Sequence, residues 1–180
     1  MPSAKRVADL ITTLRGLLAV ILAWLGHTHG RMGLSWAVWL LILSWTGDSL
    51  DGSLARRSRH KYATWIGDHD LEIDVAVSGG LLLFMVGAGL VDSLVAGLYV
   101  LAWLFIFWRW GWLRSLGMLV QAPIYGGFIW CAVHDAPTAG WWLVGWIAAA
   151  LIITWPRFPN EIVPGFLNGM HAIWAQPRRK

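Results

Sequence analysis

Six runs of apolar residues, separated by short polar stretches, constrain this chain more than any other feature. The runs cover residues 10–25, 33–50, 71–90, 93–107, 116–133 and 139–155. A membrane helix takes about 20 residues, so six of them use about 120 positions and leave no room for a soluble domain of ordinary size. The sequence therefore predicts an all-α integral membrane protein with six transmembrane helices.

The composition excludes two other classes of protein. Hydrophobic residues make up 57% and charged residues 13% of the 180 residues, against about 45–50% and 25% in soluble domains. The same hydrophobicity, with 15 Trp, excludes a disordered chain. A net charge of +4 could suggest nucleic acid, but such binding needs a basic face in water, so we expect no nucleic-acid partner.

The positions of the basic residues predict an orientation. Of 14 Lys and Arg, twelve lie in the two tails and in the second and fourth connections, which leaves only Arg15 and Arg31 elsewhere. Positive residues collect on the cytoplasmic side of a membrane. We therefore expect cytoplasmic termini and an inner-membrane location. We expect residues 1–155 to form the six-span domain and residues 156–180 to form a cytoplasmic tail, in which Pro156, Pro159 and Pro164 break any helix.

Tryptophans and glycines have simple uses in such a protein. Trp residues near the predicted helix ends, such as Trp108 and Trp142, fit interfacial anchoring, although they could also stack on a ligand. Glycines would allow helices to approach closely, within one chain or in a homodimer. These glycines are Gly79, Gly80, Gly87, Gly89, Gly126 and Gly127.

Acidic residues are concentrated around the second connection. Six of the ten carboxylates fall between positions 48 and 74. Asp48 and Asp51 are three apart where the second run ends, and Asp70 and Asp74 are four apart where the third begins, so each pair shares one helix face. If the two helices are antiparallel neighbours, all four carboxylates can meet at one place.

Four such carboxylates at a lipid boundary need a positive partner. Oxygen ligands suit Mg²⁺, Mn²⁺ or Ca²⁺, and a pair of such ions about 4 Å apart can stabilise displacement at phosphorus. The other interpretation is that basic residues of the same connection neutralise the acids in a solvated loop. These residues are Arg56, Arg57, Arg59 and Lys61.

The string DSLDGSLAR at positions 48–56, followed by Gly67, Asp70 and Asp74, resembles the signature of the CDP-alcohol phosphatidyltransferases. That signature reads D-x-x-D-G-x-x-A-R, a loop, and then G-x-x-x-D-x-x-x-D. Here two residues, not three, separate Gly67 from Asp70. The string DLITTLR at positions 9–15 is also similar to the family's N-x-x-T-x-x-R entry into the first span, with Asp for Asn. The resemblance covers about the first half of the chain.

The resemblance implies a phospholipid-synthesis reaction. A phosphatidyl group would pass from a CDP-activated lipid donor such as CDP-diacylglycerol to an acceptor alcohol, with release of CMP. Two divalent ions, Mg²⁺ or Mn²⁺, would be held by Asp48, Asp51, Asp70 and Asp74. Asp74 would either complete the metal shell or remove the acceptor's proton. Substrate contacts would come from Gly52, Ala55, Arg56, Gly67, Arg109 and Arg114.

Three alternatives remain open at this stage. Arg15, inside the first span, could serve a functional site or snorkel to the interface. Arg109 and Arg114 could receive a phosphate on the acceptor or simply set the topology. The whole chain could instead be a non-catalytic multi-span protein, such as an ion-binding channel, a transporter or a scaffold.

Overall fold

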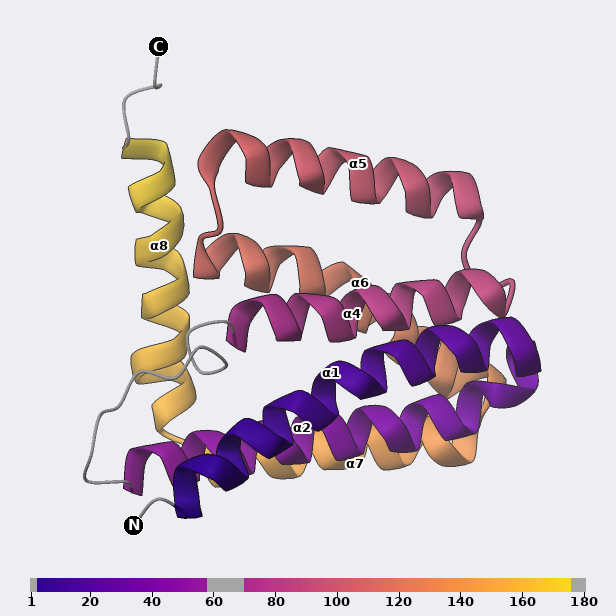
Figure 1. Cartoon of the computed structure of the whole chain (residues 1–180), viewed down its shortest axis with the longest axis horizontal. Coiled ribbons are helices and arrows are strands. Elements are labelled where there is room, and N and C mark those ends of the chain that lie inside the picture. Colours follow the sequence, from indigo (N-terminus) through magenta and orange to yellow (C-terminus); the bar gives the residue numbers. More distant parts are fainter. Residues whose placement is uncertain (1–2, 58–69, 176–180) are drawn as a thin grey trace.

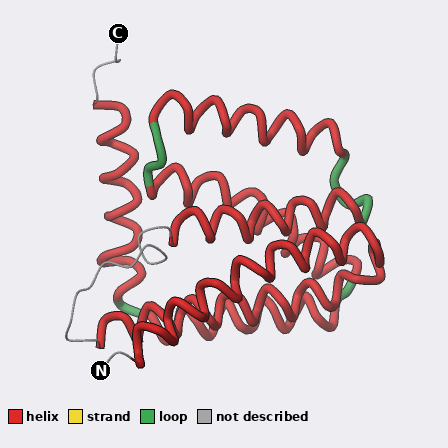
Figure 2. Tube along the Cα trace, viewed as in Figure 1, coloured by secondary structure: helices red, strands yellow, loops and turns green. Residues whose placement is uncertain are grey.

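The structure, a computed structural model, is helical throughout the part that it describes. It describes the backbone of residues 3–57 and 70–175, and the side chains of residues 10–49, 71–171 and 173. A 3₁₀ turn, Gly30–Gly33, joins the first two helices, and a π-helical turn, Phe158–Ile162, precedes the last, with no strand in these ranges (Figure 2). The helices are α1 Ser3–His29, α2 Leu34–Arg57, α4 Asp70–Gly87, α5 Ser93–Trp110, α6 Arg114–Asp135, α7 Pro137–Thr154 and α8 Val163–Ala175.

Six of these helices run roughly side by side in alternating directions, and α8 lies across one end of them (Figure 1). At that end, α2, α5 and α7 finish and α1, α4 and α6 begin. We name it the α8 end. The end of α2 and the start of α4, which flank the second connection and carry acidic and basic residues, therefore lie at the α8 end.

The long helices coincide with the six apolar runs to within a few residues, except that α1 begins seven residues earlier, at Ser3, and α2 ends seven residues later, at Arg57. Among the residues whose side chains the structure describes, four helical stretches are long and apolar enough to cross a membrane: Leu10–Ser49, which takes in most of α1 and α2, then Ser93–Trp110, Arg114–Asp135 and Pro137–Thr154. α4 is not among them, and only residues 71–87 of this helix have described side chains. The fold is thus consistent with an all-α membrane protein.

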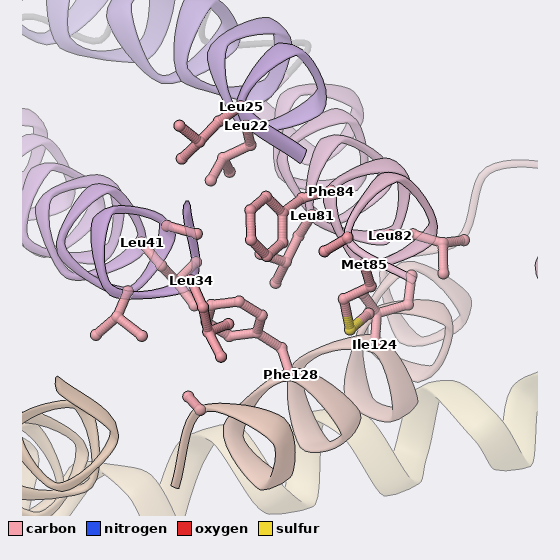
Figure 3. Close-up of a cluster of buried hydrophobic side chains, with 14 of the residues drawn as sticks. Leu22, Leu25, Leu34, Leu41, Leu81, Leu82, Phe84, Met85, Ile124 and Phe128 are labelled. Atoms are coloured by element: carbon pink, nitrogen blue, oxygen red, sulfur yellow. The ribbon is translucent and has the colours of Figure 1, made fainter. Parts of the chain in front are cut away.

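Side chains from four helices meet in a buried core (Figure 3). Leu22 of α1, Leu41 of α2, Phe84 of α4 and Phe128 of α6 are fully buried, and the two phenyl rings pack edge to face with centroids 6.1 Å apart. The convergence of the aspartates was argued for the case that α2 and α4 are direct neighbours, but these helices face each other across this core. α1 instead makes extensive contact with both of them.

Small residues explain how closely α1 and α4 pack. A Cβ on Gly80 would collide with the backbone of Ala19, and a Cβ on Gly87 would lie 2.7 Å from the carbonyl carbon of Gly26. Only residues without a side chain allow helix backbones to approach in this way. The prediction of glycine-mediated approach is therefore confirmed at Gly80 and Gly87, whereas a Cβ on Gly79, Gly89, Gly126 or Gly127 would meet no described atom of another segment within 4 Å.

The prediction that prolines would prevent helix formation after the last span is wrong. Pro159 lies in the π-helical turn, and Pro164 is the second residue of α8. Backbone N–H groups in the first turn of a helix have no partner in that helix, so a proline costs little there. α8 packs on the start of α6, where the Ser115 hydroxyl donates to the Phe166 carbonyl oxygen at 3.3 Å.

Candidate functional site

Arg15 of α1 joins α2 and α4 at the α8 end. Its Nη1 lies 2.9 Å from Asp48 Oδ1 of α2, and its Nη2 donates to Asp74 Oδ1 of α4. A guanidinium is a planar fork with donors on separate nitrogens, so it can hold two carboxylates at once. One positive group thus brings together two acids from opposite sides of the core.

Exposure differs sharply among the three side chains. The Arg15 side chain is 4% exposed, while those of Asp48 and Asp74 are 47% and 29% exposed. The guanidinium therefore approaches from the interior of the bundle, and the carboxylates are open toward its surface. Part of each aspartate side chain is therefore accessible from outside the bundle.

The close packing of α1 on α2 depends on Gly47, the residue before Asp48. A Cβ at this position would lie 3.2 Å from Ile11 Cγ2 and 3.7 Å from Arg15 Cδ. Glycine leaves room for the apolar stem of Arg15 to lie against α2. Thr12, one turn before Arg15 on α1, is also buried.

Two buried hydroxyls lie one helical turn farther into the bundle than the aspartates. Ser44 precedes Asp48 by four residues, and Ser78 follows Asp74 by four, so each shares a helix face with its aspartate. The Ser78 hydroxyl donates to the Val75 carbonyl oxygen at 2.8 Å. The Ser44 hydroxyl is buried without a hydrogen-bond partner in the described part of the chain. The sequence analysis missed both, although their spacing from the aspartates could have indicated them.

Tyr125 of α6 is a further neighbour that the sequence analysis missed. It packs on α2 three residues before Asp48. Its ring packs edge to face on Trp45 of α2, with centroids 5.1 Å apart. An isolated tyrosine in an apolar run gives no sequence signal for this position, because only the packing of α6 places it there.

The remaining aspartates of the predicted metal site are placed only by their backbone. Asp51 lies three residues beyond Asp48 in α2, and Asp70 is the first residue of α4, one turn before Asp74. Their side chains lie outside those that the structure describes. The same holds for three predicted substrate contacts in the last turns of α2, and Gly67 lies outside the described residues altogether. The three contacts in α2 are Gly52, Ala55 and Arg56.

Arg109 and Arg114 also belong to the α8 end. Arg109 lies in the last turn of α5, with its guanidinium carbon 5.4 Å from the centroid of the Trp110 ring. Arg114 is exposed and begins α6. Within the described residues, no hydrogen bond or ion pair connects either arginine to Asp48 or Asp74.

The described carboxylates are oxygen ligands of the kind that a hard cation takes, but they are too few to complete its shell. Carboxylate oxygens are the ligands that Mg²⁺ and Mn²⁺ prefer, and Asp48 and Asp74 supply them from two helices. Among the side chains that the structure describes, no three His, Cys, Asp or Glu residues form a cluster. Asp51 and Asp70, one turn away on the same two helices, are the further residues that could supply oxygen ligands.

Comparisons of the chain with protein-family models, with curated proteins and with solved structures give no match. A functional proposal for this chain therefore depends on its own residues and on the motif that they form.

Proposed function

We propose that this chain is a membrane-bound enzyme of the CDP-alcohol phosphatidyltransferase type. Its donor would be a CDP-activated lipid and its acceptor an alcohol, and CMP would be released. The observation that carries the proposal is the convergence of Asp48 and Asp74 on a single guanidinium. These are the first and last aspartates of the signature in the sequence, and they come from different helices.

The proposal includes six membrane crossings with both termini in the cytoplasm. Alternating helix directions support it, because α1, α2, α4, α5, α6 and α7 then cross in turn (Figure 1). The distribution of charge supports the orientation, since Arg109 and Arg114 lie at the α8 end and Arg31 lies in the turn at the other end. The site would then face the cytoplasm, where a nucleotide is available.

In this reaction the acceptor oxygen attacks the phosphorus that carries the lipid, and the bond from that phosphorus to the CMP oxygen breaks. Asp74, partly exposed at the site, would take the proton of the acceptor hydroxyl. Arg56, by its place in the signature, would hold the donor diphosphate with charge-assisted hydrogen bonds. Divalent ions held by the four aspartates would supply neutralisation of the diphosphate charge.

The test uses purified protein in liposomes with CDP-diacylglycerol, Mg²⁺ or Mn²⁺ and a panel of alcohols. Released CMP is measured, and lipid products are identified by mass. Loss of a general base costs about 10²–10⁴-fold in rate, so we expect Asp74→Asn to lower CMP release by at least about 100-fold and EDTA to abolish it. Unchanged CMP release by Asp74→Asn would remove Asp74 from the mechanism.

The matched control is Glu72→Gln. Glu72 is a carboxylate of the same helix, two residues from Asp74, and therefore lies on another face. Its substitution changes the charge of α4 equally and is expected to leave CMP release within about twofold. A comparable loss in both variants would indicate a general charge effect on α4 instead of a role for Asp74.

A non-catalytic membrane protein is the second candidate function. One observation favours it: Arg15 already supplies positive charge to Asp48 and Asp74, so the three residues can act as a structural tie. A wild-type protein that releases no CMP with any acceptor, yet loses its fold when Arg15 is replaced, is the result expected of that candidate.

A further inference from the structure

The guanidinium of Arg15 lies where a cation shared by Asp48 and Asp74 would lie. Its two terminal nitrogens contact the Oδ1 atoms of both carboxylates, one of them at 2.9 Å. An ion such as Mg²⁺ binds carboxylate oxygen at about 2.0–2.1 Å and keeps a near-octahedral shell. The same two oxygens therefore cannot serve the ion and the guanidinium together without a large like-charge repulsion.

The two cations would reach the carboxylates from opposite directions. Arg15 comes from the buried side, at 4% exposure, and the carboxylates are open on the outer side, at 47% and 29% exposure. An ion arriving from the α8 end meets the aspartates before it meets Arg15. Because the two carboxylates contact different terminal nitrogens, the guanidinium can give up one of them while it keeps the other.

We propose that Arg15 is a resident counter-cation of this site, and that a divalent ion binds by displacing its guanidinium from at least one of Asp48 and Asp74. This inference rests on the proposed function, because it assigns the regulation of the same site. Arg15 then keeps the aspartates together before the metal arrives and sets the metal concentration at which the site fills. It is a positioning residue and touches neither the donor nor the acceptor.

The test measures metal binding directly and without turnover. Mn²⁺ is titrated into the protein in lipid nanodiscs, and free Mn²⁺ is read from its electron paramagnetic resonance signal. Coupling free energies between two binding equilibria are typically equivalent to about 5–150-fold in affinity, and we expect Arg15→Gln to bind Mn²⁺ at least about fivefold more tightly than wild type. If Arg15 only positioned the carboxylates, Arg15→Gln would instead bind Mn²⁺ more weakly than wild type.

Arg31→Gln is the matched control for the loss of one positive charge. Arg31 is an exposed arginine at the other end of the bundle, where it donates to the Gly89 carbonyl oxygen at 3.2 Å. Its Mn²⁺ affinity is expected to stay within about twofold of wild type. Arg15→Lys is the second variant, for use if Arg15→Gln does not fold. The lysine ammonium keeps the charge but lacks the fork that holds two carboxylates. The Mn²⁺ affinity of Arg15→Lys should therefore lie between those of wild type and Arg15→Gln.

A second measurement separates displacement from a simple field effect. In infrared difference spectra of wild type with ¹⁵N-labelled arginine, Mn²⁺ is expected to shift a guanidinium band that Arg15→Lys lacks. Mn²⁺ binding by wild type without that shift, or equal or weaker binding by Arg15→Gln, overturns the inference alone. No Mn²⁺ binding by wild type or by any variant overturns the proposed metal-dependent function as well.

Discussion

Arg15 and Asp74, 59 residues apart in the chain, form an ion pair between α1 and α4. The arginine is buried, and the aspartate is partly exposed at the end of the bundle that carries most of the charge. A buried charge is tolerated in a membrane protein only when it is paired or hydrated. The pair therefore links two requirements, the packing of α1 against α4 and the placement of a carboxylate that the proposed reaction uses.

A double-mutant cycle should show that this pair is strongly coupled. The cycle combines Arg15→Gln with Asp74→Asn and measures the free energy of unfolding in mixed micelles. Residues that share one ion-pair network typically couple by about 0.5–3 kcal/mol, and we expect at least about 1 kcal/mol here. The parallel cycle with Asp48→Asn should give a smaller value, because Asp48 is more exposed, at 47% against 29%, and water screens its charge more. Additive effects in both cycles would contradict the coupling of Arg15 to Asp48 and Asp74.

Gly80→Ala should destabilise the protein through the contact of α1 with α4. A Cβ there collides with the Ala19 backbone, and backbone cannot move aside as a flexible side chain can. Overpacking of this kind typically costs about 1–3 kcal/mol. Gly79→Ala, one residue away on the same helix and with no atom within 4 Å, is the matched control and should be neutral or stabilising, since alanine favours helix. Thermal unfolding in detergent measures both, and equal melting temperatures would exclude the close approach.

The membrane-length helices could be predicted from the sequence, because the hydropathy and the length of an apolar run depend only on consecutive residues. The α1 boundary could not, since its first turns are polar and hydropathy does not detect them. Spacing also predicted that Asp48 and Asp74 face one place. Their link to Arg15 could not be predicted, because it depends on the rotation and depth of α1, which backbone contacts such as that of Gly80 with Ala19 fix.

The error about α8 has a different physical origin. Composition alone treats a proline as a helix breaker, whereas its effect depends on its position within the helix. Pro164 is harmless because it lies in the first turn of α8. Tyr125 was missed for a third reason, since it reaches the site only through the packing of α6 and carries no local motif.

Gly169→Leu should detach α8 from the bundle. A Cβ at Gly169 would collide with the Ser115 hydroxyl of α6, whereas Gly165, one turn earlier in α8, has no atom within 4 Å. Gly165→Leu is therefore the matched control. Hydrogen exchange followed by mass spectrometry should show faster exchange over residues 163–175 in Gly169→Leu and little change in the control. Equal protection in both variants would show that α8 does not depend on this contact.

The proposed orientation predicts opposite accessibility for the two ends of the bundle. Cys131 is the single cysteine of the chain, so a Cys131→Ser background allows one cysteine to be placed at will. Met32, in the turn between α1 and α2, is 90% exposed, and Trp112, between α5 and α6, is 53% exposed. Because positive residues face the cytoplasm, a membrane-impermeant maleimide added to intact cells should label Met32→Cys and not Trp112→Cys. Permeabilised cells should label both, and labelling of Trp112→Cys alone in intact cells would reverse the orientation and move the aspartates away from the cytoplasmic nucleotide.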